Sequence, residues 1–136
     1  MTPQEAIELI RSQHRAIMAT TRSDGGVQLS PVMVAVDDDG TLMVSTRETA
    51  MKAHNLERRP HAALCVIADG FWGRWVQVEG PVSLEHLPEA MDALVRYYRN
   101  VSGEHPDWDE YRQAMVTERR LVVRLRVERA GPSREG

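Results

Sequence analysis

Two tight-turn signals near the start of the chain constrain its fold more than any other feature. The segments "RSDGG" (22–26) and "DDDG" (37–40) separate three short runs of β-forming residues, at 14–21, 27–36 and 41–46. Asp-Gly between such runs is typical of a β-hairpin. Strands joined by hairpins are antiparallel, because parallel strands need long crossover connections. Pro31 lies within the second run and predicts a bulge, a bend or an edge position there.

The rest of the chain alternates between helical and strand patterns. Helices are expected at 3–10, 48–59, 88–100 and 107–120, and further strands at 61–69, 75–84 and 121–130. The apolar run "HAALCVIAD" predicts a strand that is buried on both faces. In the helix at 48–59, the inward residues are expected to be Ala50, Ala53, Leu56 and Met51. This order of elements predicts an α+β domain built on a small closed barrel.

Length and charge exclude several classes of protein. The 136 residues suffice for one domain, expected at 1–136 with a frayed tail at 129–136. A formal net charge of −3 gives no global attraction to nucleic acid or to an anionic membrane. The start of the chain does not resemble a signal peptide, no stretch is long enough to span a bilayer, and the single cysteine, Cys65, suits a reducing compartment. We therefore expect a cytoplasmic protein.

Familiar catalytic and metal-binding motifs do not occur in the sequence. The five histidines lack zinc-site spacing, and there is no Cys-x-x-Cys, so no metal is expected. The glycines form neither a dinucleotide fingerprint nor a P-loop, and no nucleophile elbow is present. Cys65, in an apolar run, is expected to be a small buried hydrophobe.

The segment "STRETAMKAHNLERRP" (45–60) differs from the rest of the chain in kind. A strand that ends in Ser45 and Thr46 leads directly into a short helix that carries Lys52. The free N–H groups at a helix N-terminus favour an anion, and the hydroxyls and the ammonium group add donors. An equally simple interpretation is that Thr46 or Thr49 caps the helix while Lys52 is solvated. The residues alone leave both interpretations open.

The whole chain, from about His14 to Val127, resembles the flavin- and deazaflavin-binding split-barrel proteins, the superfamily of pyridoxamine 5'-phosphate oxidase. "AIMATTRSDGGVQLSPV" resembles the first hairpin of that superfamily, and "LMVSTRETAMKAHNLERRPHAAL" resembles its phosphate-binding strand-helix unit. "WVQVEGPVSL" resembles the strand beside the cofactor ring. "YYRNVSGEHPDWDEYRQAMVTERRLVV" is most similar to an actinobacterial subgroup that depends on coenzyme F420.

The resemblance implies a mainly β, six- to seven-stranded antiparallel split barrel with flanking helices, paired as a homodimer with the cofactor between the subunits. The implied cofactor-binding residues lie on the second strand, the strand-helix unit and the strand after it: Ser30, Pro31, Val32, Met33, Ser45, Thr46, Met51, Lys52, Asn55 and Trp75. Relatives often carry Ser or Arg just before the lysine. Here Ala50 and Met51 precede Lys52, so fewer donors are expected around the phosphate.

The implied activity is transfer of a hydride from reduced F420 to an unsaturated organic substrate. An FMN-dependent oxidoreductase and a cofactor carrier without turnover are the alternatives. The sequence identifies no side chain as the proton donor. The proton is therefore expected to come from solvent or from a tyrosine, with Tyr97, Tyr98 and Tyr111 as candidates. Packing at an interface is the simpler role for these three tyrosines. Arg47, Arg58, Arg59 and Arg74 offer a basic lip for the acidic tail of F420, or an ordinary solvated surface.

Overall fold

A long strand, β6 (Arg74–Glu85), joins two halves of one curved antiparallel sheet in the computed structural model, which describes residues 1–135 and the side chains of residues 1–132. The other strands are β1 (Arg15–Thr21), β2 (Val27–Met33), β3 (Ala35–Val36), β4 (Leu42–Arg47), β5 (His61–Ile67), β7 (Arg120–Leu125) and β8 (Arg129–Glu135). Their order is β2-β1-β5-β6-β7-β4-β3, and β8 pairs with β6 outside this path. The sheet therefore curls into a barrel that stays open between β2 and β4.

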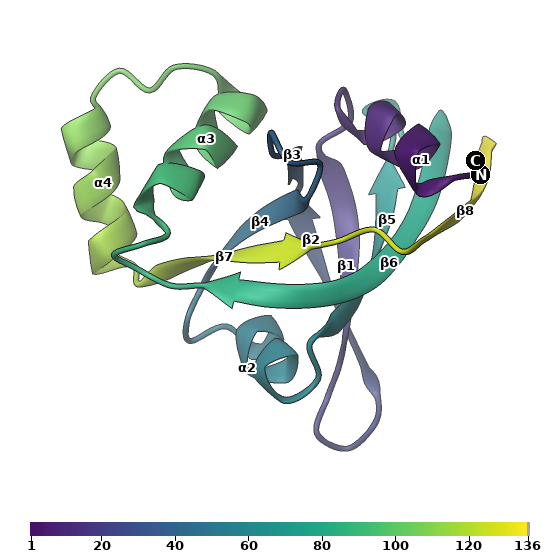
Figure 1. The fold of residues 1–136 in the computed structure, drawn as a ribbon, viewed down its shortest axis with the longest axis horizontal. Helices are drawn as coiled ribbons and strands as arrows, with labels where there is room; N and C mark the ends of the chain where they lie inside the picture. Colours follow the sequence, from purple (N-terminus) through teal and green to yellow (C-terminus); the bar gives the residue numbers. More distant parts are fainter. Residues whose placement is uncertain (136) are drawn as a thin grey trace.

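Four helices surround the barrel: α1 (Pro3–Ile10), α2 (Met51–Arg58), α3 (Met91–Ser102) and α4 (Trp108–Thr117). Figure 1 shows α3 and α4 together at one end of the sheet, α1 at the opposite end beside β8, and α2 below the barrel. Thr2 caps α1 by accepting a hydrogen bond from the Glu5 N–H, as the sequence pattern predicts. None of these helices, within residues 1–135, has the length and apolar composition needed to cross a membrane.

The hydrophobic core has two parts, one on each face of the β4–β7 half of the sheet. Inside the barrel, alternate residues of β4 and β7 pack with α1 and α2; examples are Val44, Leu121 and Leu56. Outside it, Met43 and Val122 pack against α3 and α4. Because strand neighbours point to opposite faces, one strand supplies both clusters. Successive residues of β4 therefore belong to different clusters.

The split-barrel fold that the resemblance implies is confirmed, but the barrel is open between β2 and β4 and not closed, and the strands differ from the predicted ones in three details. Strand β5 is buried on one face only, since Ala62, Leu64 and Val66 are buried while Cys65 and its neighbours on the other face stay half-exposed. The second predicted strand is divided into β2, which stops at Met33, and β3; the edge position of β2 is one of the outcomes that Pro31 predicts, and it is confirmed. Residues 129–135 are not frayed but form β8, paired with β6, because β6 would otherwise expose an edge there; Gly136 lies outside the described residues.

Candidate functional site

The opening between β2 and β4 forms a cleft of about 620 Å³. Its walls come from β1, β2, β4, α2, α3, β7, the end of β5 and the segment that follows it. The residues that line it are Arg15, Ala16, Ile17, Pro31, Val32, Met33, Ser45, Thr46, Lys52, Ile67, Ala68, Asp69, Phe71, Tyr97 and Arg120. One wall is largely apolar, and the opposite wall carries two hydroxyls and two cations. We call this space the cleft.

The apolar wall belongs to the edge strand β2, whose outer backbone groups have no neighbouring strand within the described part of the chain. The Val34 N–H donates to the His14 carbonyl at 2.7 Å, and Pro31 lies opposite Ile17. In an antiparallel ladder, alternate residues face the partner strand, so Pro31 and Met33 turn their carbonyl groups outward. The proline has no N–H that such a ladder would leave unpaired. This edge offers carbonyl and amide groups to a flat ring.

The polar wall ends at the N-terminus of α2. The N-cap residue is Ala50, which has no side chain to accept a hydrogen bond, so the helix is not capped by Thr46 or Thr49. The backbone N–H groups of Met51 and Lys52 find no acceptor among the described residues. Two unsatisfied N–H groups and the positive end of the helix dipole therefore face the region around Lys52.

Side chains on the neighbouring strands add to this positive region. Thr46 is only 3% exposed, yet its hydroxyl has no partner among the described residues, and it lines the cleft. Burial and the nearby charge of Arg120 lower the pKa of Lys52 below its usual value. Lys52 has no carboxylate partner among the described residues, so its charge beside Arg120 would be stabilised by a bound anion. We call Thr46, Lys52, Arg120 and the two free N–H groups the anion seat.

A second hollow of about 360 Å³ continues from the anion seat. It shares Thr46, Lys52 and Arg120 with the cleft, and Arg47, Thr49 and Ala50 complete its lining. A molecule anchored at the seat can therefore extend in both directions, along the apolar wall and past α2. We call this continuation the side hollow.

Tyr97 closes the cleft on the side of α3. Its hydroxyl donates to the Met33 carbonyl at 2.9 Å, and burial raises its pKa. Tyr111 donates instead to the Leu94 carbonyl at 2.8 Å, and burial raises its pKa to about 12. Tyr98 packs within an aromatic cluster with His105, Trp108 and Tyr111. Of these three tyrosines, Tyr97 lines the cleft.

The structure brings together six of the ten residues expected to bind a cofactor, namely Pro31, Val32, Met33, Ser45, Thr46 and Lys52. Ser30 is adjacent, and its buried hydroxyl has no hydrogen-bond partner in the described part of the chain. Met51 is 58% exposed and points away from the core, contrary to its expected inward position. Helix geometry explains this, since the buried face of α2 is occupied by Ala53 and Leu56.

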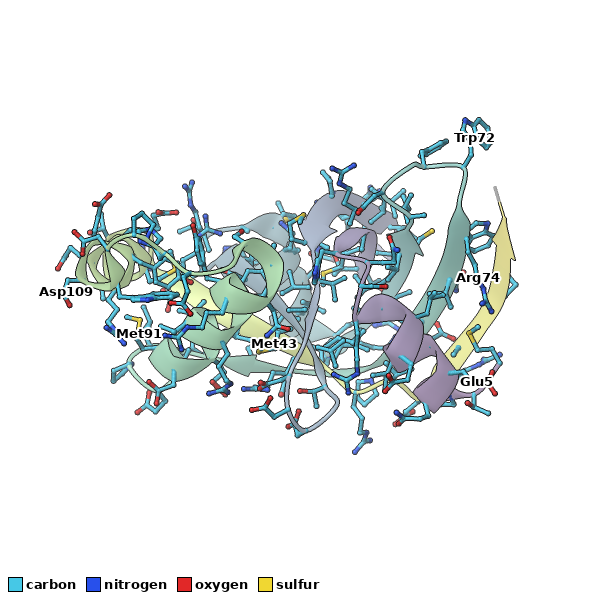
Figure 2. All side chains as sticks on the ribbon, turned by 90° about the horizontal axis from the view of Figure 1, so that it is seen from above. Glu5, Met43, Trp72, Arg74, Met91 and Asp109 are labelled. Atoms are coloured by element: carbon cyan, nitrogen blue, oxygen red, sulfur yellow. The ribbon has the colours of Figure 1, made fainter. Side chains whose placement is uncertain are left out.

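Asn55 and Trp75 lie outside the cleft lining. The Asn55 amide is buried, donates to the Thr20 hydroxyl at 3.1 Å and accepts from Arg58 at 2.8 Å, so it ties α2 to β1. Trp75 lines a neighbouring apolar hollow of about 270 Å³, which shares Ile67 and Phe71 with the cleft. Figure 2 shows Trp72 at the tip of a loop that extends away from the barrel, with Arg74 at the start of β6. Of the four arginines proposed as a basic lip, Arg47 lines the side hollow.

Sequence reasoning missed Arg15, Asp69 and Arg120 as lining residues of the cleft. Arg120 had a usable signal, because it begins a strand next to Leu121 and belongs to a basic pair at 119–120 that follows a helix. Its proximity to Lys52 depends on the pairing of β4 with β7, which joins Thr46 to Leu121. That pairing could not be read from local patterns.

The chemical capacity of the site is to hold an anionic group and a flat ring side by side. Histidine, cysteine and carboxylate side chains do not gather in threes anywhere in residues 1–135 in a way that could hold a metal ion. The cleft lining contains no serine or cysteine with an adjacent histidine. The arrangement is therefore one of binding and orientation, which is what a protein contributes when a bound cofactor carries the reaction.

Comparisons with known proteins bear on the family and the fold of the chain. The family model for pyridoxamine 5'-phosphate oxidase matches residues 2–133. Conserved hypothetical protein Rv2991 from Mycobacterium tuberculosis is 25% identical, with a TM-score of 0.76 over 99% of this chain and 85% of that one. A structure named F420 reductase is 21% identical, with a TM-score of 0.68 over 91% and 94% of the two chains. HutZ, a heme storage protein from Vibrio cholerae, is 18% identical, with a TM-score of 0.72 over 100% and 98%. The last two likenesses bear on the fold alone.

Proposed function

The chain belongs to the pyridoxamine 5'-phosphate oxidase family, and from this premise we propose that it is an oxidoreductase that uses coenzyme F420 to reduce an unsaturated organic substrate. The family and the fold support a cofactor-binding protein of the oxidoreductase type. The choice of F420 rests on the segment at 97–123, which resembles an F420-dependent subgroup, and on one structural observation.

That observation is the continuity of the cleft with the side hollow through the anion seat. FMN ends in a phosphate, so an FMN site needs no space beyond it. The phosphate of F420 is a diester that continues into an acidic tail. The side hollow supplies room for such a tail beyond Lys52, and Arg47 lies on its wall. The anion seat opens into the side hollow on the side away from the apolar wall, and this arrangement favours F420 over FMN.

The residues present fit such a cofactor. The hydroxyl of Thr46, a residue of the cleft lining, and the free N–H groups of Met51 and Lys52 lack partners within the described residues, and a phosphate accepts hydrogen bonds from all three donors. The outward carbonyl and amide groups of β2 would hold the ring edge. When bound, the reduced deazaflavin supplies a hydride to an electron-poor carbon. The apolar wall from Ile17 to Val32 would exclude water from one face of the ring.

We further propose that the protein is a homodimer, with the partner subunit completing the cleft. Large apolar side chains of β2 and the loop after β5 are exposed, and they include Val27, Leu29, Phe71 and Trp72. Leu29 is 64% exposed on the edge strand that forms the apolar wall. Leu29→Glu should shift the protein toward monomer in analytical ultracentrifugation and weaken cofactor binding together. A wild-type protein that sediments as a monomer at tens of micromolar would exclude this part of the proposal.

The cofactor assignment is tested by titration with F420, FMN and haem, followed by tryptophan fluorescence. Preferential binding of F420 at micromolar concentration supports the proposal, and preferential binding of FMN or haem contradicts it. Reduction of a panel of enones and quinones by reduced F420 then tests for turnover. Binding without reduction of any of them would favour a carrier protein over an enzyme.

A further inference from the structure

Glu118 holds two of the three basic side chains around the side hollow. Its Oε1 atom accepts from Arg47 Nη2 at 3.2 Å, and from Arg120 Nε at 3.1 Å and Nη2 at 2.8 Å. These hydrogen bonds, from Arg120 first and then from Arg47, lower the pKa of Glu118 below its usual value. One carboxylate thus serves two guanidinium groups at the wall of the anion seat.

Lys52 is left as the cation of this group without a carboxylate partner among the described residues. The charge that an incoming ligand must balance is therefore smaller than the number of basic residues suggests. A phosphodiester carries one negative charge. A phosphomonoester carries between one and two at neutral pH, because its second pKa is near 6. The two ligand classes therefore differ in their negative charge, and Glu118 affects how much negative charge the anion seat can balance.

We propose that Glu118 is a specificity-determining residue, which lowers the positive potential of the anion seat so that a phosphodiester is favoured relative to a phosphomonoester. This inference rests on the proposed function in that the phosphate of the cofactor lies at the seat. Glu118 lines neither the cleft nor the side hollow, so it would act through Arg47 and Arg120. Each extra negative charge on the ligand is repelled by its carboxylate, so its removal helps a monoester more than a diester.

A plainer role for Glu118 would be to hold the arginines in place at the end of α4. The two roles separate on substitution. Glu118→Gln keeps the shape and the hydrogen-bond acceptor but removes the charge, and Glu118→Asp keeps the charge on a shorter side chain. If the residue only positions Arg47 and Arg120, both variants weaken all phosphate ligands to a similar degree. If its charge sets the preference, only the glutamine variant changes the ratio between the two ligand classes.

The experiment compares FMN with riboflavin 4',5'-cyclic phosphate, which have the same ring but carry a phosphomonoester and a phosphodiester. Dissociation constants are measured by flavin fluorescence at pH 8 in the full-length protein. We expect Glu118→Gln to shift the ratio of affinities toward FMN by about threefold to tenfold, which is modest because the charges are partly solvated. Glu118→Asp should keep the wild-type ratio. Glu110→Gln removes a carboxylate from α4 that touches neither arginine and should also leave the ratio unchanged.

A pH series provides a second test of whether the charge of Glu118 sets the preference. FMN gains its second negative charge as the pH rises from 5 to 8, whereas the cyclic phosphate does not. The ratio should therefore change more with pH in Glu118→Gln than in the wild type. An unchanged ratio in Glu118→Gln at every pH, or an equal loss of affinity for both flavins, would overturn the inference.

The outcome does not depend on whether F420 is the true cofactor. If F420 fails to bind or to support turnover while the flavin pair shows the expected shift, the proposed function is wrong and the role of Glu118 stands. If F420 binds and supports turnover but the ratio of affinities does not change, the proposed function stands and the role of Glu118 is wrong. A protein that binds F420, FMN and the cyclic phosphate no better than millimolar would overturn both.

Discussion

Tyr97 on α3 donates its hydroxyl hydrogen to the carbonyl oxygen of Met33 on β2 at 2.9 Å, across the end of the cleft. This hydrogen bond joins the helical end of the molecule to the edge strand that forms the apolar wall. The Met33 carbonyl faces outward from the sheet and has no strand neighbour within the described residues. The position of β2 relative to the cleft therefore depends in part on α3.

Replacing Tyr97 by Phe should loosen this end of the cleft. We expect the free energy of unfolding to fall by about 0.5–1.5 kcal/mol, the usual contribution of one hydrogen bond, and cofactor affinity to fall severalfold. Chemical denaturation and fluorescence titration measure the two effects. Tyr98→Phe is the matched control, because the Tyr98 ring packs in the aromatic cluster of α3 and α4 and its hydroxyl makes no hydrogen bond with the described residues. Equal effects of the two substitutions would argue against a role for the Met33 contact.

Lys52→Ala should weaken cofactor binding by about 1.5–3 kcal/mol, the range for a hydrogen bond to a charged group. The fold should tolerate the change, because Lys52 makes no ion pair with the described residues and its pKa is already lowered by burial and by Arg120. Removing it relieves repulsion in the free protein. Isothermal titration with the cofactor and thermal unfolding without it test both parts.

Arg59→Ala is the control for this prediction, since Arg59 is exposed at the other end of α2. Its affinity should match that of the wild type. Unchanged affinity in Lys52→Ala would show that the phosphate does not lie at the anion seat.

Local patterns were sufficient to predict most of the elements and the part of the site that is continuous in sequence. Ser45, Thr46 and Lys52 meet because a strand runs directly into a helix, and that connection is visible in the sequence. Arg120 and Glu118 complete the same region from a distant segment, through the pairing of β4 with β7. Which strands pair is decided by the burial of whole faces, and no short pattern encodes it.

Trp75 and Met51 show a second limit of sequence reasoning. Alternation in β6 correctly separates Trp75 from Val76 and Val78, but it cannot tell which hollow lies on the other face. For Met51, hydrophobicity suggested an inward position, whereas the start of a short helix leaves that residue exposed. The sequence shows which residues of a strand or helix share a face more reliably than it shows which part of the protein that face contacts.

Ser30→Ala should separate stability from binding. The Ser30 hydroxyl is buried without a hydrogen-bond partner in the described part of the chain, which costs free energy in the unliganded protein. We expect the alanine variant to be as stable as the wild type or more stable by up to about 1 kcal/mol. If the hydroxyl bonds to the ring, cofactor affinity should fall at the same time. Ser83→Ala, at an exposed position of β6, should change neither quantity. A clear loss of stability in Ser30→Ala would mean that the hydroxyl is satisfied in the free protein.

Asp37→Asn should destabilise the fold in a manner that depends on pH. The Asp37 side chain is 6% exposed and accepts from Arg96 at 2.9 and 3.1 Å and from Arg124 at 2.9 Å, so it fastens α3 to the barrel. Removing its charge leaves two arginines without full compensation, and we expect a loss of about 2–4 kcal/mol at pH 7. Asp38→Asn, next to it and exposed, should have little effect.

The sign of the pH dependence follows from the direction of the shift. The hydrogen bonds from Arg96, and then those from Arg124, hold the pKa of Asp37 well below its unfolded value of 3.8. A carboxyl with a depressed folded pKa contributes stability that is fully present above the unfolded pKa and is lost as the pH falls toward the folded one. The difference between wild type and Asp37→Asn in urea denaturation should therefore be constant from pH 7 to about 5 and shrink below about 4. A difference that stays constant down to pH 3 would show that the substitution acts through packing rather than through the ion pairs.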